Sequence, residues 1–186
     1  MSPEPRIILG LDPGIALLGY GVIDVLGEEM RHVEHGCIAT SPGQPLPNRL
    51  RALFDGLTEV KRRFAVTDVA VETLFYSRNV TTAVAVGQAR GVALLATVDD
   101  TTTFGEYAPS EIKQIVGGFG AARKREMQEM VRLLLDLDRL PSPDDAADAL
   151  AVAICTLDGP NSPPFSPPVE FPKHDDRWFE GKHPAC

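Results

Sequence analysis

The most constraining feature of the sequence is a pair of apolar segments near its start, joined by only a few residues. Residues 6–11, RIILGL, lead into Asp12 and a Pro-Gly pair, and a second apolar segment follows at about 18–25. A link this short favours antiparallel strands, because a parallel pair needs a crossover of a dozen or more residues. The chain should therefore begin as a sheet in which Asp12 stands at the end of the first strand.

The remaining apolar pattern extends this pair into a larger sheet. We predict strands at about 30–40, 68–72 and 104–109 from their apolar residues and flanking turns. Helical spacing predicts helices at 46–64, 79–98, 110–116 and 123–136, and a last helix that begins near Ser142. The expected fold class is α/β: a five-stranded mixed sheet, three antiparallel strands followed by α/β units, flanked by helices on both faces.

Length and composition indicate one domain with an appendage. A chain of 186 residues with 44% hydrophobic residues can bury one core but not two large ones. Seven of its 16 prolines lie in the last 29 residues, so we expect a domain at 1–157 and an extended or disordered tail at 158–186. The N-terminus lacks a signal-peptide pattern, and no apolar run reaches the roughly 18 residues that span a bilayer. These features predict a cytoplasmic protein with no membrane partner.

Carboxylates recur at the ends of the predicted elements. Asp12 follows the first strand and Glu72 ends the fourth, while Asp145 and Asp148 are three residues apart on one face of the last helix. If the two strands are neighbours, the four side chains converge. Asp12 also fits a turn-forming residue, and Glu72 a solvated strand end.

The last helix offers local explanations for some of its acids. Ser142 is expected to cap it, with Pro143 at its first position, and Asp144 then favours the helix dipole. Asp145 fits the same role. Asp148 lies among alanines on a helix that otherwise suits burial, and a charge in that environment requires a partner.

Clustered carboxylates point to metal-ion chemistry. Four of them would repel one another and raise their own pKa values, whereas divalent cations would cancel the charge. Oxygen ligands suit Mg²⁺ or Mn²⁺. Two ions about 3.5–4 Å apart can activate water and stabilise the leaving oxygen of a phosphodiester. The sequence therefore predicts two Mg²⁺ ions per site, with Mn²⁺ able to substitute, and phosphodiester hydrolysis.

The overall charge bears on this prediction. With 26 acidic and 18 basic residues the net charge is −8, which taken alone argues against a nucleic-acid partner. Carboxylates that hold metal ions, however, do not count as bare negative charge. The charge balance therefore leaves a nucleic-acid substrate open.

Several segments resemble a known family. The acids at two strand ends and a final helix resemble the ribonuclease H superfamily. The segments GLDPG, VETLFYSRN, GQARGVAL, YAPSEIKQIVGGFGAARK and DDAADALAVAI are similar, in order and spacing over roughly residues 6–157, to the RuvC family of bacterial crossover-junction endonucleases. The resemblance implies a homodimer that binds a four-way Holliday junction in DNA recombination and repair. It further implies symmetric nicks with 5′-phosphate and 3′-hydroxyl ends, and the partner proteins RuvA and RuvB.

The same resemblance implies roles for individual residues. Asp12 would bridge two metals, with Glu72 on one and Asp148 on the other, and Asp145 would support the Asp148 side. Phe75 would stack on a base near the junction centre, and the helix at 79–99, rich in small residues, would form the dimer. The side chains implied to contact DNA are Phe75, Arg78, Lys113 and Lys124.

Three of these residues also fit ordinary structural roles that involve no DNA. Phe75 also fits an ordinary core residue, Lys113 a solvated helix face and Lys124 a flexible loop. These readings stay open at this point.

Three other functions are compatible with part of this pattern. An ATP-binding module of the actin and sugar-kinase type also has an acid and a glycine in a turn between two strands, but it needs a second domain and a second phosphate loop. A superfamily relative acting on RNA would share the metal site. A junction-binding protein without catalysis would not need all four acids. The segments around Phe75 and Gly87 favour the RuvC family.

Overall fold

The computed structural model describes residues 4–73, 80–118 and 122–157. Five strands form one sheet in the order β3-β2-β1-β4-β5. Three of them are antiparallel neighbours: β1 (Arg6–Asp12), β2 (Leu17–Leu26) and β3 (Glu29–Ala39). The other two, β4 (Asp68–Glu72) and β5 (Thr103–Tyr107), continue the sheet parallel to β1. The predicted five-stranded mixed sheet is confirmed.

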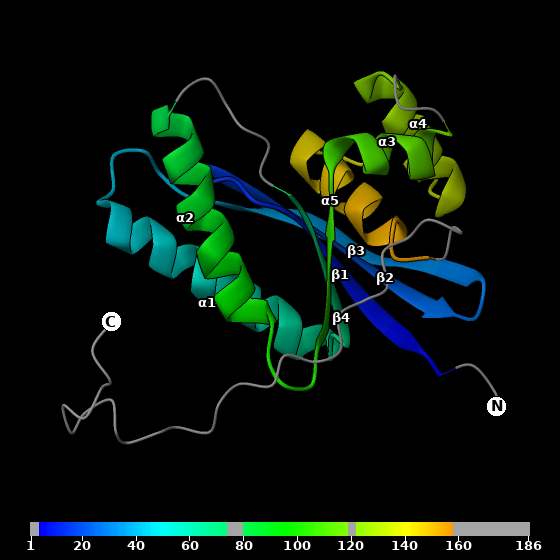
Figure 1. Cartoon of the computed structure of the whole chain (residues 1–186), viewed down its shortest axis with the longest axis horizontal. Helices are drawn as coiled ribbons and strands as arrows, with labels where there is room; N and C mark the ends of the chain where they lie inside the picture. The colour runs from blue at the N-terminus through cyan, green and yellow to red at the C-terminus, as the bar shows by residue number, and fades with distance from the viewer. Residues whose placement is uncertain (1–3, 74–79, 119–121, 158–186) are drawn as a thin grey trace, which may run out of the picture.

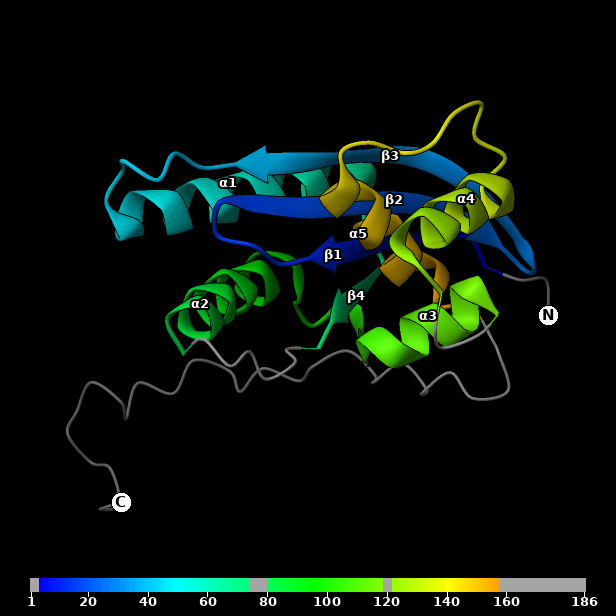
Figure 2. The ribbon, with the colours of Figure 1, turned by 90° about the horizontal axis from the view of Figure 1, so that it is seen from above.

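Helices cover both faces of this sheet, as predicted. Helices α1 (Leu46–Phe64) and α2 (Val80–Thr97) lie on one side, and α3 (Pro109–Gly117), α4 (Lys124–Leu134) and α5 (Asp144–Ile154) lie on the other (Figure 1). Seen from above, α5 crosses directly over β1 and β2 (Figure 2). Within the described residues, none of the helices has the length and hydropathy needed to span a bilayer.

The alternation of side chains along each strand decides which residues face α5. Leu9 and Leu11 of β1 pack in the core beneath α1 and α2, whereas Ile8 packs with α5 residues. In β4, Val69 and Val71 pack in the core beneath α1 and α2, whereas Ala70 packs in the core with the α5 residues. Because successive side chains point to opposite faces, the strand-end residues Asp12 and Glu72 lie on the α5 face.

Three glycines allow α5 to rest directly on the sheet. A Cβ added to Gly10 would overlap the carbonyl oxygen of Ala149, and one added to Gly19 would overlap that of Asp145. A Cβ on Gly21 would lie 2.7 Å from Leu150 Cδ2. Gly19 is paired with Asp12 across the two strands. The first turn of α5 is therefore held beside Asp12.

The start of α5 differs from the sequence prediction. Ser142 does not cap this helix: Pro143 is the N-cap residue, and the helix begins at Asp144. The backbone N–H groups of Ala146 and Ala147 donate to the Pro143 carbonyl oxygen, at 3.1 and 3.2 Å. The helix therefore starts one residue later than predicted, which takes Ser142 out of the capping position.

Helix α4 also ends earlier than the predicted residue 136. It stops at Leu134, and Asp136 adopts a left-handed conformation with φ of 50°. A left-handed residue cannot continue a right-handed helix.

A buried ionic network ties the sheet together at the end opposite Asp12. Asp68 of β4 is only 4% exposed. It accepts hydrogen bonds from the Arg6 guanidinium at 3.0 and 3.2 Å, from the Thr67 hydroxyl at 2.6 Å, and from the Thr103 hydroxyl. Burial works against the charged form, but the bonds from Arg6, Thr103 and Thr67 lower the pKa of this carboxyl below its ordinary value. The network joins β1, β4 and β5.

We expect Asp68→Asn to lower the free energy of unfolding by about 1–3 kcal/mol, because the hydrogen bonds from Arg6, Thr67 and Thr103 lose their charged acceptor. The wild-type contribution should persist above the ordinary Asp pKa and disappear as the pH falls below it, since the folded-state pKa is lowered. Urea unfolding at pH 7 and pH 3 measures both effects. The control is Asp55→Asn, which removes a pair with the fully exposed Arg51 and should leave the free energy of unfolding almost unchanged, because water screens exposed charges.

Candidate active site

The site lies at the ends of β1 and β4, where the strand order changes direction within the sheet. Leu11 of β1 and Val71 of β4 are partners in parallel register, and Asp12 and Glu72 are the next residues on the two strands. Neighbouring strands are about 4.8 Å apart. The chain leaves β1 toward β2 on one side and reaches β4 on the other. The crevice at the carboxyl ends of strands at such a switch point is where open α/β sheets bind ligands.

Helix α5 brings two further acids to this point. Asp145 and Asp148 lie in its first half, and the Asp145 carbonyl sits over Gly19, the partner of Asp12. The structure thus places all four predicted carboxylates at one end of the β1–β4 pair. The four carboxylates can meet only because of the glycines described above, since a side chain at those positions would push α5 away from the sheet.

The acids interact through their charges. Burial and, after it, the negative charges of Glu72, Asp148 and Asp145 together raise the pKa of the Asp12 carboxyl to about 7, against the effect of Lys124. Burial followed by the Asp148 charge raises the pKa of Glu72. Burial likewise raises the pKa of Asp148, against the opposing effect of Lys124. The cluster therefore holds more negative charge than its surroundings neutralise.

Lys124 partly compensates for that charge. As the first residue of α4, it places its ammonium 3.2 Å from an Asp144 carboxylate oxygen and 3.3 Å from one of Asp148. Gln128, one turn later, donates to Asp144 at 2.9 Å. These contacts join the first turns of α4 and α5. Lys124 therefore lies at the start of a helix rather than in the flexible loop considered for it.

Asp144 is the residue whose contacts the sequence analysis missed. It had been assigned to the helix dipole alone, whereas its carboxylate also binds Lys124 and Gln128 across the helix interface. Lys124 and Gln128 are four residues apart, as are Asp144 and Asp148, so each pair presents one face. That matching spacing was the available signal, but it becomes informative only once α4 and α5 are known to be neighbours.

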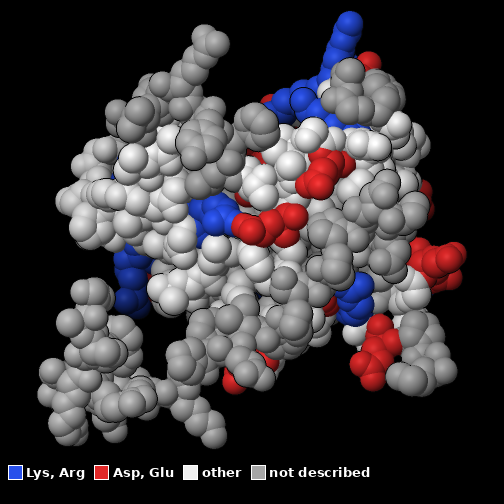
Figure 3. Space-filling model, in the orientation of Figure 1, with Lys and Arg blue, Asp and Glu red and all other residues white. Residues whose placement is uncertain are grey.

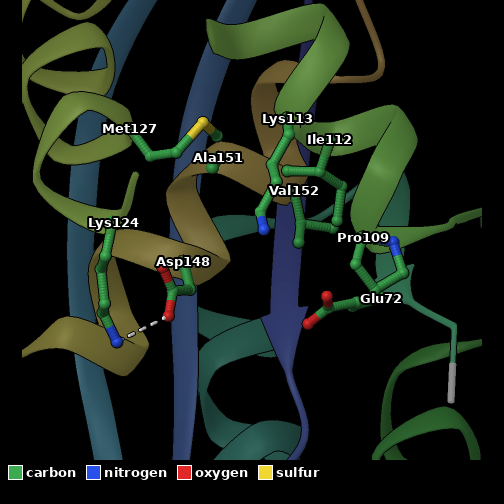
Figure 4. A pocket seen from close by; sticks show the side chains of 9 residues that line it. All are labelled: Glu72, Pro109, Ile112, Lys113, Lys124, Met127, Asp148, Ala151 and Val152. Carbon is green, nitrogen blue, oxygen red and sulfur yellow. Dashed lines mark ion pairs between the residues drawn. The ribbon is translucent and has the colours of Figure 1, made fainter. Parts of the chain in front are cut away.

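A cavity of about 280 Å³ adjoins the acids. Glu72, Asp148, Lys113 and Lys124 form its charged part (Figure 4). The Lys113 ammonium points toward the space between Glu72 and Asp148 in that view, and its positive charge lowers the pKa of Glu72 against the effect of burial. The remaining walls are apolar, from Pro109, Ile112, Met127, Ala151 and Val152. The cavity therefore has a charged side and an apolar side.

Two acidic side chains fix the helices that carry these lysines. The Glu111 carboxylate accepts a hydrogen bond from the Ala108 N–H at 2.6 Å at the start of α3. Glu126 accepts one from the Arg123 N–H at 2.7 Å at the start of α4. Each bond satisfies a backbone donor that a helix N-terminus otherwise leaves without a partner. Lys113 and Lys124 thus project from helices whose N-termini are fixed by these hydrogen bonds.

The donor set suits a hard divalent cation. All four acids offer oxygen ligands, and a cation beside Asp12 would favour the ionised form of this carboxyl, whose pKa is raised. Within the described residues, no three acidic, histidine or cysteine side chains stand close enough to coordinate one ion as placed. The Lys124 ammonium lies 3.3 Å from an Asp148 carboxylate oxygen. A cation at Asp148 would therefore compete with Lys124 for that carboxylate.

Two predicted DNA contacts, Phe75 and Arg78, lie outside the described residues. Their stacking and DNA-binding roles stay predictions. On the face shown in Figure 3, the described acidic and basic side chains form small separate groups among uncharged surface. The described residues thus form no broad basic area on that face.

The strand order, the flanking helices and the acids on β1, β4 and α5 define a ribonuclease H-like fold with a carboxylate site at the β1–β4 switch point. A family model described as "Crossover junction endodeoxyribonuclease RuvC" matches residues 8–156. The chain therefore belongs to the RuvC family of crossover junction endodeoxyribonucleases, and it is an endonuclease.

Individual relatives agree with this assignment. The RuvC of Rubrobacter xylanophilus is 51% identical over 154 residues, covering 83% of this chain and 86% of that protein. The RuvC of Thermomicrobium roseum is 55% identical over 148 residues, covering 80% and 90%. A solved structure of Thermus thermophilus RuvC with a Holliday junction substrate is 37% identical, with a TM-score of 0.76, covering 80% and 91%. The kinase-type alternative is thereby set aside.

Proposed function

We propose that this protein resolves four-way DNA junctions by metal-dependent hydrolysis of one phosphodiester in each of two strands. The observation that carries the proposal is the meeting of Asp12, Glu72, Asp145 and Asp148 at one end of the sheet, with Lys113 and Lys124 beside them. The family relationship supports a junction as substrate, since the Thermus thermophilus relative was solved with one.

The acidic and the basic residues of the site have different proposed roles. Asp12, Glu72, Asp145 and Asp148 would hold two Mg²⁺ ions, with Mn²⁺ as a substitute; such ions activate a water and stabilise the leaving oxygen. Lys113 and Lys124 would hold phosphate oxygens, because an ammonium is a compact donor for a phosphodiester. Hydrolysis would then leave a 5′-phosphate and a 3′-hydroxyl, ends that can be ligated.

Symmetric cutting supports a homodimer, because one chain provides one such site. Helix α2 carries exposed apolar side chains, with Leu95 73% and Val84 55% exposed. A second copy would cover these positions. We propose the α2 face as the dimer interface, with Phe75 and Arg78 contacting the junction. RuvA and RuvB are proposed as partners on the family resemblance alone.

Metal binding should be visible without any substrate. We expect Mg²⁺ to raise the melting temperature at pH 8 by several degrees and to raise it far less at pH 5.5, since Asp12 with its pKa of about 7 is protonated there. Thermal unfolding with Mg²⁺ and with chelator, at both pH values, measures this. An equal rise in Asp12→Asn would indicate binding elsewhere.

The activity itself is tested with a labelled synthetic four-way junction and a matched linear duplex, each incubated with Mg²⁺, with Mn²⁺ and with chelator. We expect paired, symmetric nicks on the junction only, and only with metal. Equal cutting of the duplex would assign the protein a different substrate. Binding without cutting under every metal would identify a junction-binding protein that lacks catalysis.

A further inference from the structure

The cavity beside the carboxylates has a charged side and an apolar side, and the proposed hydrolysis uses only the charged side. Its charged side holds Glu72, Asp148 and the two lysines, and its other side is formed by Ile112, Met127 and Val152 (Figure 4). A nucleotide has the same division, with a charged phosphodiester attached to a largely apolar sugar ring. At about 280 Å³ the cavity is close to the lower end of the range for small-ligand pockets, roughly 300–1,000 Å³.

The apolar side belongs to the packed core and has a fixed shape. Val152 is 1% exposed, Ile112 6% and Met127 7%. The Met127 sulfur reaches the last turn of α3, where it would lie 3.1 Å from a Cβ placed on Gly117. Three helices thus contribute to one wall, and Lys124 and Gln128 hold α4 against α5 at its edge.

Among the described residues, the wall has no uncharged polar side chain that could bond to a neutral hydroxyl. The nine described residues that line the cavity include four charged side chains and no uncharged polar one. In the proposed reaction the charged groups are engaged by phosphate oxygens and cations. A hydroxyl against Ile112, Met127 and Val152 would lose its water without gaining a hydrogen bond.

We propose that this wall binds the deoxyribose next to the cleaved phosphate and excludes ribose there. Resting on the junction-cleaving function proposed above, this assignment makes Met127 and Ile112 specificity-determining residues for the sugar. The C2′ of deoxyribose is a methylene and packs on an apolar surface, whereas ribose places a hydroxyl at that carbon. The metal site alone does not distinguish the two sugars, so the wall supplies the distinction.

The first experiment changes only the sugar. Junctions carry deoxyribose, ribose or 2′-fluorodeoxyribose at the nucleotide on one side of the cut, and in a second set on the other side. We expect kcat/KM to fall about 10- to 100-fold for ribose on one side only, from the unmatched hydroxyl. The 2′-fluoro sugar, which lacks the hydroxyl but favours a ribose-like ring pucker, should be cut nearly as well as DNA. Ribose cut as fast as deoxyribose, or 2′-fluoro cut as slowly as ribose, would overturn the proposal.

The second experiment changes the wall. Met127→Gln keeps the length of the side chain and adds a hydrogen-bonding amide, so the preference for deoxyribose should shrink about five-fold or more. Met127→Leu is the apolar control and should keep the preference. Ile112→Thr provides an independent polar variant in case Met127→Gln fails to fold. An unchanged preference in the folded polar variants contradicts the role of the wall.

A binding measurement separates this proposal from the catalytic one. The chain has four methionines, so methyl NMR of the ¹³C-methionine protein, with Met127 assigned through Met127→Leu, reports contact directly. Adding a deoxydinucleotide with Mg²⁺ should shift the Met127 methyl signal more than the matching ribodinucleotide does. If the all-DNA junction is not cut, the proposed function fails, while this shift still decides the sugar site. No shift with either dinucleotide overturns the sugar site even in an active enzyme.

Discussion

Asp12→Asn should abolish junction cleavage, by at least about 10³-fold, while the folded protein still binds the junction. Asparagine keeps the shape of the side chain but loses the charge that would bind both metal ions. Loss of a negative charge also weakens repulsion of the DNA phosphates, so binding should be unchanged or tighter. Single-turnover cleavage and a binding titration on the same junction measure the two effects.

The same substitution should stabilise the metal-free protein. The pKa of Asp12 is about 7 when folded and 3.8 ordinarily. Between those pH values the folded protein keeps a proton that the unfolded chain has lost, so stability falls as the pH rises through this window. Asp12→Asn removes the penalty, and we expect a gain of about 2 kcal/mol at pH 8 and little gain below pH 4.

Two comparisons make this prediction specific. Asp24→Asn, on β2 opposite Ile7 at the far end of the sheet, removes an acid far from the site and should leave cleavage unchanged. Wild-type cleavage by Asp12→Asn would remove this residue from the mechanism. A variant that loses activity and stability together would indicate a structural role instead.

Gly19→Ala should disable the site without touching any acid. The added methyl group would overlap the backbone carbonyl oxygen of Asp145, so the first turn of α5 must move away from the sheet. A displacement of about 1 Å can cost about 100-fold in rate when it misplaces reacting groups, and we expect a loss of that size. Overpacking should also lower the free energy of unfolding by about 1–3 kcal/mol.

The control for this substitution is Gly43→Ala in the loop between β3 and α1. The nearest atom to a Cβ there is the Ser41 hydroxyl oxygen at 3.9 Å, an ordinary contact. Cleavage rates and urea midpoints of both variants, compared with the wild type, separate helix displacement from a general effect of alanine. Wild-type cleavage by Gly19→Ala would mean that the position of α5 does not set the activity.

Much of this arrangement could be predicted from the sequence because it depends on local pattern. The apolar runs that end at Asp12 and Glu72 gave both the strands and the acids at their ends. The alanines around Asp148 indicated a helix suited to burial, and eight residues of α5 are buried.

The parts that were missed depend on contacts between distant segments. The partners of Asp144 lie on α4, 16 and 20 residues earlier in the chain, and no local pattern names them. The start of α5 was misplaced by one residue, because Ser142 and Pro143 can each be read as a cap until the carbonyl that accepts the first hydrogen bonds is seen. The cavity wall likewise combines three helices whose relative positions are set by tertiary packing.

The glycines at positions 10, 19 and 21 have a consequence for engineering. Because main-chain atoms of α5 lie directly against Gly10 and Gly19, the spacing of helix and sheet at these two positions does not depend on how the rest of the core is packed. Volume-conserving substitutions beneath α1 and α2, on the opposite face, can therefore be used to make a thermostable nuclease while the distances among its acids stay as they are.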